Sequence, residues 1–308
     1  MRFTIYQESR LGGRKNNEDR VAHSYSRDAL LMAVADGMGG HHYGEVAAQI
    51  AVQTLVQRFQ HEARPSLADP FLFLQQNIDA AHYAILDYAK HYRLTDLPRT
   101  TLVACIVQNN IAYWAHAGDS RLYLIRRNRV IRQTRDHSRV RYMLDEGLIS
   151  RAQAEKHPDR NKIYSCLGGL QMPEVEYSRK TPLEAGDLLM LCTDGLWGMM
   201  ADDSWLRALC VPDMVEAARC FMQQTEKQVG VGGDNLSIVL VRWEEGYMPP
   251  EHSGVSTRFM AETEVNASLV DFGRDPHYAS DLSDEEIEEA IREIHSAIEK
   301  FSSPKSGK

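Results

Sequence analysis

Hydrophobic positions near the start of the chain follow first a strand spacing and then a helix spacing. Residues 3–8 alternate apolar and polar side chains, as a half-buried strand does. Apolar residues recur every three or four positions over 45–61 and again over 70–88, and Asp69-Pro70 is a typical helix start before the second run. We therefore expect one strand followed by two amphipathic helices with buried apolar faces.

Short apolar runs follow in the middle of the chain. Four strand-like runs cover 101–107, 111–117, 122–125 and 129–134. The links between them are short and rich in Asn, Gly and Asp, so the pattern predicts adjacent antiparallel strands.

The second half continues with a polar stretch and then with more regular elements. Residues 137–180 are polar and are broken by Gly and Pro, which indicates an excursion packed beside the sheet. Strands are predicted at 187–192 and 236–241, with a helix between them at 211–228.

The globular pattern ends near Trp243. Residues 246–280 contain Pro249-Pro250 and little periodicity, which predicts a flexible linker. Residues 281–301 are predicted to form an amphipathic helix, and residues 302–308 a disordered tail.

The predicted C-terminal helix has a clear start signal and a narrow apolar seam. Ser283 and Glu286 form a capping box, and apolar residues then alternate at spacings of four and three. Because an isolated helix of this length is marginal in water, the seam needs a partner surface. We expect residues 283–301 to dock on their own domain, on a partner or on a second copy of the chain.

Composition narrows the class of protein. The 308 residues are 43% hydrophobic and 25% charged, an ordinary globular balance, and the net charge of −8 argues against nucleic acid or anionic membrane as the main partner. The five cysteines are odd in number and lack a CxxC pair, which favours reduced thiols. The N-terminus lacks a signal-like apolar region and no apolar stretch is long enough to span a membrane, so we expect a cytoplasmic protein.

The candidate chemistry lies in acidic residues beside glycine at the ends of predicted strands. The apolar run before Asp36-Gly37 reads as a strand that stops in a tight glycine turn, where it exposes a carboxylate and a carbonyl oxygen. Asp119, Asp194 and Asp234 have the same setting, and Glu18 and Asp19 lie in a polar loop near the N-terminus. Oxygen-only ligands favour Mg²⁺ or Mn²⁺ over zinc, and clustered carboxylates without a cation would repel one another.

Such a centre is suited to hydrolysis at phosphorus. Two cations a few ångströms apart can bridge one water, lower its pKa and hold it as hydroxide for in-line attack. The phosphoryl oxygens then need a positive clamp. Arg14, four residues before Glu18, is the candidate because a guanidinium matches phosphate bidentately.

Seven segments in chain order resemble the metal-dependent protein phosphatases of the protein phosphatase 2C family, particularly the bacterial serine/threonine members. They are RKNNED, VADGMGGHHYGE, TTLVAC, AGDSRLYLIR, TRDHS, CTDGLWG and GGDNLSIVLV. The resemblance covers roughly residues 3–243 and implies an α+β phosphatase domain over 1–245. That domain would be a four-layer α/β/β/α sandwich, two packed antiparallel sheets flanked by helix pairs, with 137–180 as a flap that borders the site.

The resemblance also implies an activity and roles for individual residues. The activity is dephosphorylation of phosphoserine and phosphothreonine in proteins, opposing a serine/threonine kinase, with two catalytic Mg²⁺ or Mn²⁺ ions. The resemblance implies that Asp36 bridges the two ions, that the Gly37 carbonyl ligates one, and that Asp194 and Asp234 hold the other. Glu18 would act through metal-bound water, and Asp119 with Asp194 would hold an additional ion. Arg14 would bind the phosphate, and Asp19 and Asn235 would support the ligands.

Two positions depart from the family pattern. Met38 stands where eukaryotic members carry a His, so the leaving group must take its proton from metal-bound water or another side chain, or need it less; His41 and His42 are nearby candidates. Arg99 replaces a usual Gly before Thr100, which could alter the turn there. The alternative function is a catalytically idle regulator. It is disfavoured because such a protein is expected to have lost metal ligands, and none is missing.

Overall fold

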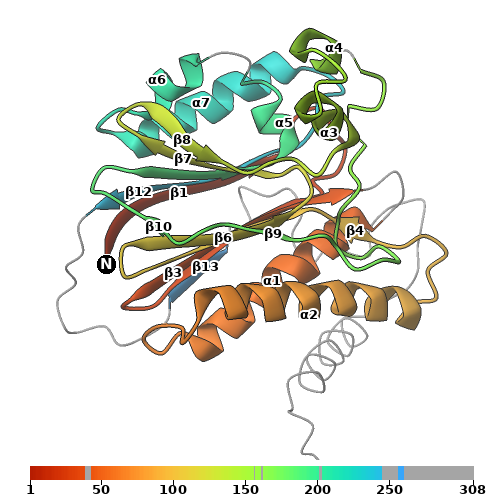
Figure 1. Ribbon diagram of the computed structural model, residues 1–308, viewed down its shortest axis with the longest axis horizontal. Coiled ribbons are helices and arrows are strands. Elements are labelled where there is room, and N and C mark those ends of the chain that lie inside the picture. Colours follow the sequence, from red (N-terminus) through yellow and green to blue (C-terminus); the bar gives the residue numbers. More distant parts are fainter. Residues whose placement is uncertain (39–42, 156, 161, 201–202, 245–255, 260–308) are drawn as a thin grey trace, which may run out of the picture.

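Two antiparallel β-sheets pack face to face between layers of helices in the computed structural model (Figure 1). The structure describes residues 1–38, 43–155, 157–160, 162–200, 203–244 and 256–259. The first sheet has the order β1 (Arg2–Arg10), β12 (Leu236–Glu244), β11 (Leu188–Cys192), β7 (Arg121–Arg126) and β8 (Arg129–Gln133). The second has the order β10 (Thr181–Pro182), β6 (Ile111–Ala117), β5 (Leu102–Gln108), β3 (Ala29–Met38), β2 (Asp19–Tyr25) and β13 (Ser256–Phe259), with β4 (Arg99–Thr100) paired to β3 and β9 (Glu176–Tyr177) paired to β6.

Helices cover the outer face of each sheet. Helices α1 (Gly44–Glu62) and α2 (Pro70–His91) lie on the second sheet, and α5 (Asp194–Trp197), α6 (Ser204–Leu209) and α7 (Met214–Val229) lie on the first (Figure 1). The predicted four-layer sandwich is therefore confirmed. In α2, Asp69 is the N-cap and accepts hydrogen bonds from the backbone N–H groups of Phe71 and Leu72, as the Asp-Pro signal predicts.

The buried residues form three layers, which explains the continuous apolar runs. In β3, Leu30 and Met32 face the core between the sheets, whereas Leu31 and Ala33 face α1 and α2. Because successive side chains of a strand point to opposite faces, a strand buried on both sides is apolar throughout. Strand β12 divides its side chains in the same way between the inter-sheet core and the layer under α7.

One predicted pairing is wrong. The four runs between 101 and 134 form two hairpins, β5–β6 and β7–β8, but β6 and β7 belong to different sheets. The link Gly118-Asp119-Ser120 therefore crosses from one sheet to the other. Gly118 has φ +108°, and a Cβ there would meet the Thr101 side chain at 2.7 Å, so glycine permits the crossing.

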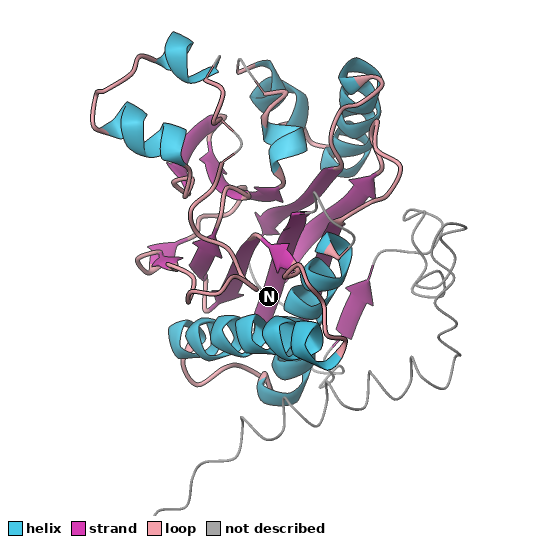
Figure 2. Cartoon of the chain, turned by 90° about the vertical axis from the view of Figure 1, so that its right-hand side faces the viewer, coloured by secondary structure: helices cyan, strands magenta, loops and turns pink. Residues whose placement is uncertain are grey.

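Residues 137–180 lie beside the sandwich and contain α3 (Arg139–Asp145), α4 (Arg151–Glu155) and β9 (Figure 2). Of the predicted linker 246–280, the described residues are Ser256–Phe259, which form β13 as an edge strand paired with β2. The predicted helix at 281–301 and tail at 302–308 lie outside the described residues. Within the described ranges, we find no helix with the length and apolar character that crossing a membrane requires.

Candidate metal centre

A cavity of about 370 Å³ lies where loops and strand ends of both sheets meet. Its lining residues are Arg14, Lys15, Asn16, Glu18, Asp36, Gly37, Met38, Thr101, Asp119, Ile163, Asp194, Asp234 and Asn235. Every predicted metal ligand and Arg14 line this cavity, as does Asn235; Asp19 does not, is 1% exposed and lies opposite Asp36 in the β2–β3 register. The acids thus converge at one edge of the sandwich, from both sheets.

Strand β3 presents Asp36 and Gly37 without a turn. The predicted tight glycine turn is wrong, because β3 continues to Met38 and Gly37 pairs with Thr100 of β4. What requires glycine is close approach: a Cβ on Gly37 would lie 2.3 Å from the backbone of Gly44 and 2.7 Å from the carbonyl oxygen of Glu18. The strand therefore brings the Glu18 loop and the start of α1 against the Asp36 carboxylate.

The threonines after Arg99 hold the backbone of Asp36. The Asp36 N–H donates to Thr101 Oγ1 (3.0 Å), the Thr101 N–H donates to the Asp36 carbonyl (2.8 Å), and Thr100 Oγ1 donates to the same carbonyl (2.9 Å). Arg99 lies on strand β4 opposite Met38 and is not among the residues with positive φ. No turn at this position needs glycine, so Arg99 is accommodated.

The first sheet contributes two acids through loops in contact. Asp194 is the first residue of α5, two residues after the end of β11, and Asp234 lies two residues before the start of β12. A Cβ on Gly195 would lie 2.1 Å from the Asn235 carbonyl oxygen and 3.0 Å from Asp234 Cβ. Glycine at 195 therefore lets the two loops touch, which places both acids on one cavity wall.

Asp119 is held by a residue that the sequence patterns did not single out. The indole Nε1–H of Trp197 donates to the Asp119 carbonyl at 2.8 Å. The Arg121 guanidinium lies 3.5 Å from the centre of the Trp197 ring and forms an ion pair with Asp136. The indole thus connects the link at 118–120, which crosses between the sheets, to helix α5, whose first residue is Asp194.

Asn235 and Asp19 contact the backbone and side chains around the acids. The Glu18 N–H donates to Asn235 Oδ1 (2.9 Å), and Asn235 Nδ2 donates to the carbonyls of Leu11 (2.8 Å) and Asn16 (3.0 Å). The buried Asp19 carboxylate accepts from Thr193 Oγ1 at 2.8 Å. Both residues therefore fix the segments that carry Glu18 and Asp194.

Burial and mutual repulsion make the carboxylates basic. Burial, and then the neighbouring acids, raise the pKa of Asp36 and of Asp119 well above the usual range. Burial chiefly raises the pKa of Asp19 and of Glu18 to about 7, and the pKa of Asp194 is also raised. Carboxylates in this state either hold protons or need cations, so the donor set fits hard divalent metal ions.

Arg14 supplies part of the positive charge that the carboxylates need. Its Nε and Nη2 donate to the two oxygens of Asp234 at 3.0 and 2.8 Å, and this contact raises the pKa of Arg14. The two side chains are 53% and 41% exposed, so the pair faces the cavity opening.

The residue after Asp36-Gly37 is Met38, whose thioether side chain cannot donate a proton. Met38 lines the cavity, and among its described lining residues none is a histidine. His41 and His42 lie outside the described residues. The cavity lining also includes Lys15, Asn16, Thr101 and Ile163, which were not predicted; Ile163 comes from the polar stretch 137–180 and places that stretch at the cavity.

Comparison with known proteins assigns the family. The family model described as protein phosphatase 2C matches residues 7–230. The serine/threonine protein phosphatase PstP of Mycobacterium tuberculosis is 33% identical over 244 residues, 78% of this chain and 45% of that protein. This chain thus spans about half the length of that relative. The serine/threonine phosphatase Stp of Listeria welshimeri is 32% identical over 235 residues, 74% of this chain and 90% of that protein.

Solved structures agree with the sequence matches. The crystal structure of M. tuberculosis PstP has a TM-score of 0.68 at 33% identity, over 79% of this chain and 99% of that one. The PstP catalytic domain in complex with two manganese ions has a TM-score of 0.65 at 32% identity, with the same coverage. Since the family match extends over well more than half of its residues, this chain belongs to the protein phosphatase 2C family.

Proposed function

We propose that this protein is a Mg²⁺- or Mn²⁺-dependent phosphatase that hydrolyses phosphoserine and phosphothreonine in proteins. The observation that carries the proposal is the meeting of four aspartates, Asp36, Asp119, Asp194 and Asp234, with Arg14 around one open cavity. Family membership and the named activity of the related proteins support the same reaction. An idle regulator is the weaker alternative, because the ligand set is complete.

The metal ligands follow from the donors in the cavity. Asp36 and the Gly37 carbonyl, with Glu18 behind them, would hold one cation; Asp36, Asp194 and Asp234 would hold the second. Asp119 would hold an additional cation with Asp194. When bound, the cations supply a lowered pKa for bound water and neutralise charge that develops on the phosphoryl group. The manganese-bound structure of the related PstP domain supports Mn²⁺ as one usable ion.

In the proposed reaction, Arg14 positions the phosphate. Arg14 lies at the cavity opening and can reach either Asp234 or a phosphate oxygen. An exposed ion pair contributes only about 0.2–1 kcal/mol, so the guanidinium leaves Asp234 readily. Once the charge of Asp234 is neutralised by a cation, we expect Arg14 to turn to the phosphate and hold two of its oxygens.

None of the described residues that line the cavity is a histidine, so the leaving group needs another source for its proton. Met38 gives an apolar wall beside Asp36, so a proton must come from cavity water or from a carboxylic acid of the lining.

Substrates and partners follow from the activity and remain part of the proposal. Phosphorylated proteins would bind across the opening beside residues 137–180, and an opposing serine/threonine kinase would supply them. Docking of residues 283–301 and a cytoplasmic location, both expected from the sequence, stay predictions; a chain ending at residue 246 compared in mass with the full chain tests the first, and cell fractionation the second.

A direct assay tests the proposed function. The full chain is expected to release phosphate from a phosphothreonine peptide when Mn²⁺ is present, and to stop when a chelator removes it. A folded protein that binds Mn²⁺ yet releases no phosphate from phosphothreonine, phosphoserine or p-nitrophenyl phosphate would favour the idle regulator.

A further inference from the structure

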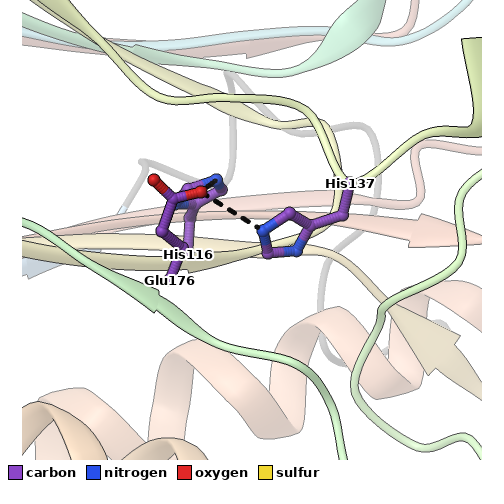
Figure 3. A group of neighbouring side chains, drawn as sticks. All are labelled: His116, His137 and Glu176. Carbon is purple, nitrogen blue, oxygen red and sulfur yellow. Dashed lines mark ion pairs between the residues drawn. The ribbon is translucent and has the colours of Figure 1, made fainter. Parts of the chain in front are cut away.

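A second group of possible metal ligands lies outside the carboxylate cavity. His116 at the end of β6, His137 before α3 and Glu176 on β9 point toward one another (Figure 3). One donor atom from each lies within 4.8 Å of the others. The side chains of His116 and His137 are 2% and 4% exposed, whereas the Glu176 side chain is 52% exposed and opens the group to solvent.

His116 carries a buried nitrogen without a partner. Its Nε2 lies 2.7 Å from the carbonyl oxygen of Arg135, so in the neutral ring Nε2–H donates there. Its Nδ1 then holds a lone pair, is shielded from water, and finds no hydrogen-bond partner among the described residues. A ring proton on a backbone carbonyl with the other nitrogen free is the arrangement of a metal-binding histidine.

The carboxylate of Glu176 sits beside both rings but bonds to neither. Its Oε2 lies 3.7 Å from His137 Nε2 and 4.0 Å from His116 Nε2, beyond the range of about 2.7–3.2 Å for a hydrogen bond. Ligands at about 2.0–2.1 Å from a tetrahedral zinc are separated by about 3.3–3.4 Å. One donor atom from each of the three residues lies within 4.8 Å of the others, so a bound ion would draw these atoms together by up to about 1.4 Å.

His137 is held in place by its neighbours. Its ring stacks against His116 on one side (centroids 4.6 Å apart) and Tyr164 on the other (5.6 Å). The Gly118 N–H makes a long 3.3 Å contact to His137 Nδ1, which ligation through Nε2 would break as the ring proton moves to Nδ1.

We propose that His116, His137 and Glu176 bind a transition-metal ion of the Zn²⁺ class, separately from the carboxylate centre. Two imidazoles and one carboxylate suit Zn²⁺, whereas Mg²⁺ prefers oxygen ligands alone. Water would fill the fourth position on the exposed side of Glu176. The ion would join β9, at the end of the 137–180 stretch, to β6, two residues before Asp119.

Metal titration of full-length variants tests the site. Asp36→Asn combined with Asp194→Asn weakens the carboxylate centre, and in this background Glu176→Gln removes one proposed ligand. Glu174→Gln is the matched control, because Glu174 is also exposed and lies two residues away on the same segment. Co²⁺ absorption reports tetrahedral coordination, Zn²⁺ competition gives affinity, and imidazole ¹⁵N shifts show which ring nitrogens bind.

We expect one Zn²⁺ per chain in the double-variant background, a tetrahedral Co²⁺ band and shifted imidazole nitrogens. Glu176→Gln should weaken Zn²⁺ at least tenfold, and Glu174→Gln should leave it unchanged. Equal Zn²⁺ affinity in the two glutamine variants, or no Zn²⁺ uptake in the double-variant background while circular dichroism shows a folded chain, would overturn the proposal. The activity assay with Mn²⁺ is independent of either result.

Discussion

Arg14 makes a two-point ion pair with Asp234, with nitrogen–oxygen distances of 3.0 and 2.8 Å. Arg14, the residue proposed to bind the phosphate, is thus paired with Asp234, a proposed metal ligand. The same guanidinium cannot hold Asp234 and a phosphate with both of its forked nitrogens, so metal binding and phosphate binding are linked through this residue.

Replacing Arg14 should separate these two roles. We expect Arg14→Ala to lower kcat/KM for a phosphothreonine peptide about 10- to 150-fold, the equivalent of a charge-assisted hydrogen bond of about 1.5–3 kcal/mol. Mn²⁺ affinity should stay equal or increase, because Asp234 loses its competitor. Arg14→Lys should recover little, since an ammonium cannot form the fork. Weaker Mn²⁺ binding by Arg14→Ala would contradict the linkage.

Trp197 should act on the site through Asp119. Trp197→Phe removes the N–H that donates to the Asp119 carbonyl, and we expect it to lower the free energy of unfolding by about 0.5–1.5 kcal/mol and to raise the Mn²⁺ concentration needed for half-maximal activity. Trp205→Phe is the control, because Trp205 packs on Tyr123 under the first sheet. An equal change of Mn²⁺ dependence in both variants would show that the indole contact has no specific role.

Gly37 should tolerate no side chain. A Cβ there would overlap the Gly44 backbone, so we expect Gly37→Ala to lower the free energy of unfolding by about 1–3 kcal/mol and to weaken Mn²⁺ binding. Gly169→Ala provides the comparison, because a Cβ at that position meets its nearest atoms at 3.8 Å. Thermal melting and Mn²⁺ titration measure both effects, and indistinguishable melting of the two variants would disprove the close approach.

The stability of the metal-free protein should fall as pH rises. Glu18 and Asp19 have pKa values raised to about 7, whereas carboxyl groups of an unfolded chain titrate near pH 4. Between these values the folded state binds more protons than the unfolded state, so the free energy of unfolding decreases with increasing pH.

Thermal melts with a chelator, from about pH 5 to about pH 7.5, should therefore show a decreasing melting temperature. Saturating Mn²⁺ should remove most of this slope, because cations replace the protons. A melting temperature that rises with pH in the chelated protein would mean that these acids are not crowded as the structure shows.

Periodicity predicted most of the fold because the central strands are buried on both faces. Leu30 to Val34 form an unbroken apolar run for that reason, and the helices over 45–61 and 70–88 were predicted close to their observed bounds. The crossing at Gly118 was missed, since a hairpin link and a link between sheets use the same turn residues. Strand β2 was not predicted, because polar residues such as His23 and Ser24 interrupt its apolar pattern.

The site could be predicted as a set of residues but not as an arrangement. Acid-glycine pairs and the order of segments identified the acidic residues and Arg14 that line the cavity, but not Lys15 or Ile163. The contact between Trp197 and Asp119 joins positions 78 residues apart, and no local pattern encodes it. Gly37 was identified for a turn, but it lies within β3; its actual requirement, contact with Gly44, depends on tertiary packing.

The central claim is that Asp36 holds the metal ions for phosphate hydrolysis. Its most direct test is Mn²⁺ binding and phosphate release measured together on Asp36→Asn. The control is Asp28→Asn, because Asp28 is partly exposed, pairs with Arg27 and does not line the cavity. We predict that Asp36→Asn stays folded, binds Mn²⁺ at least tenfold more weakly and loses at least about 10³-fold in kcat, while Asp28→Asn matches the wild type. Phosphate release by Asp36→Asn at the wild-type rate would contradict the account.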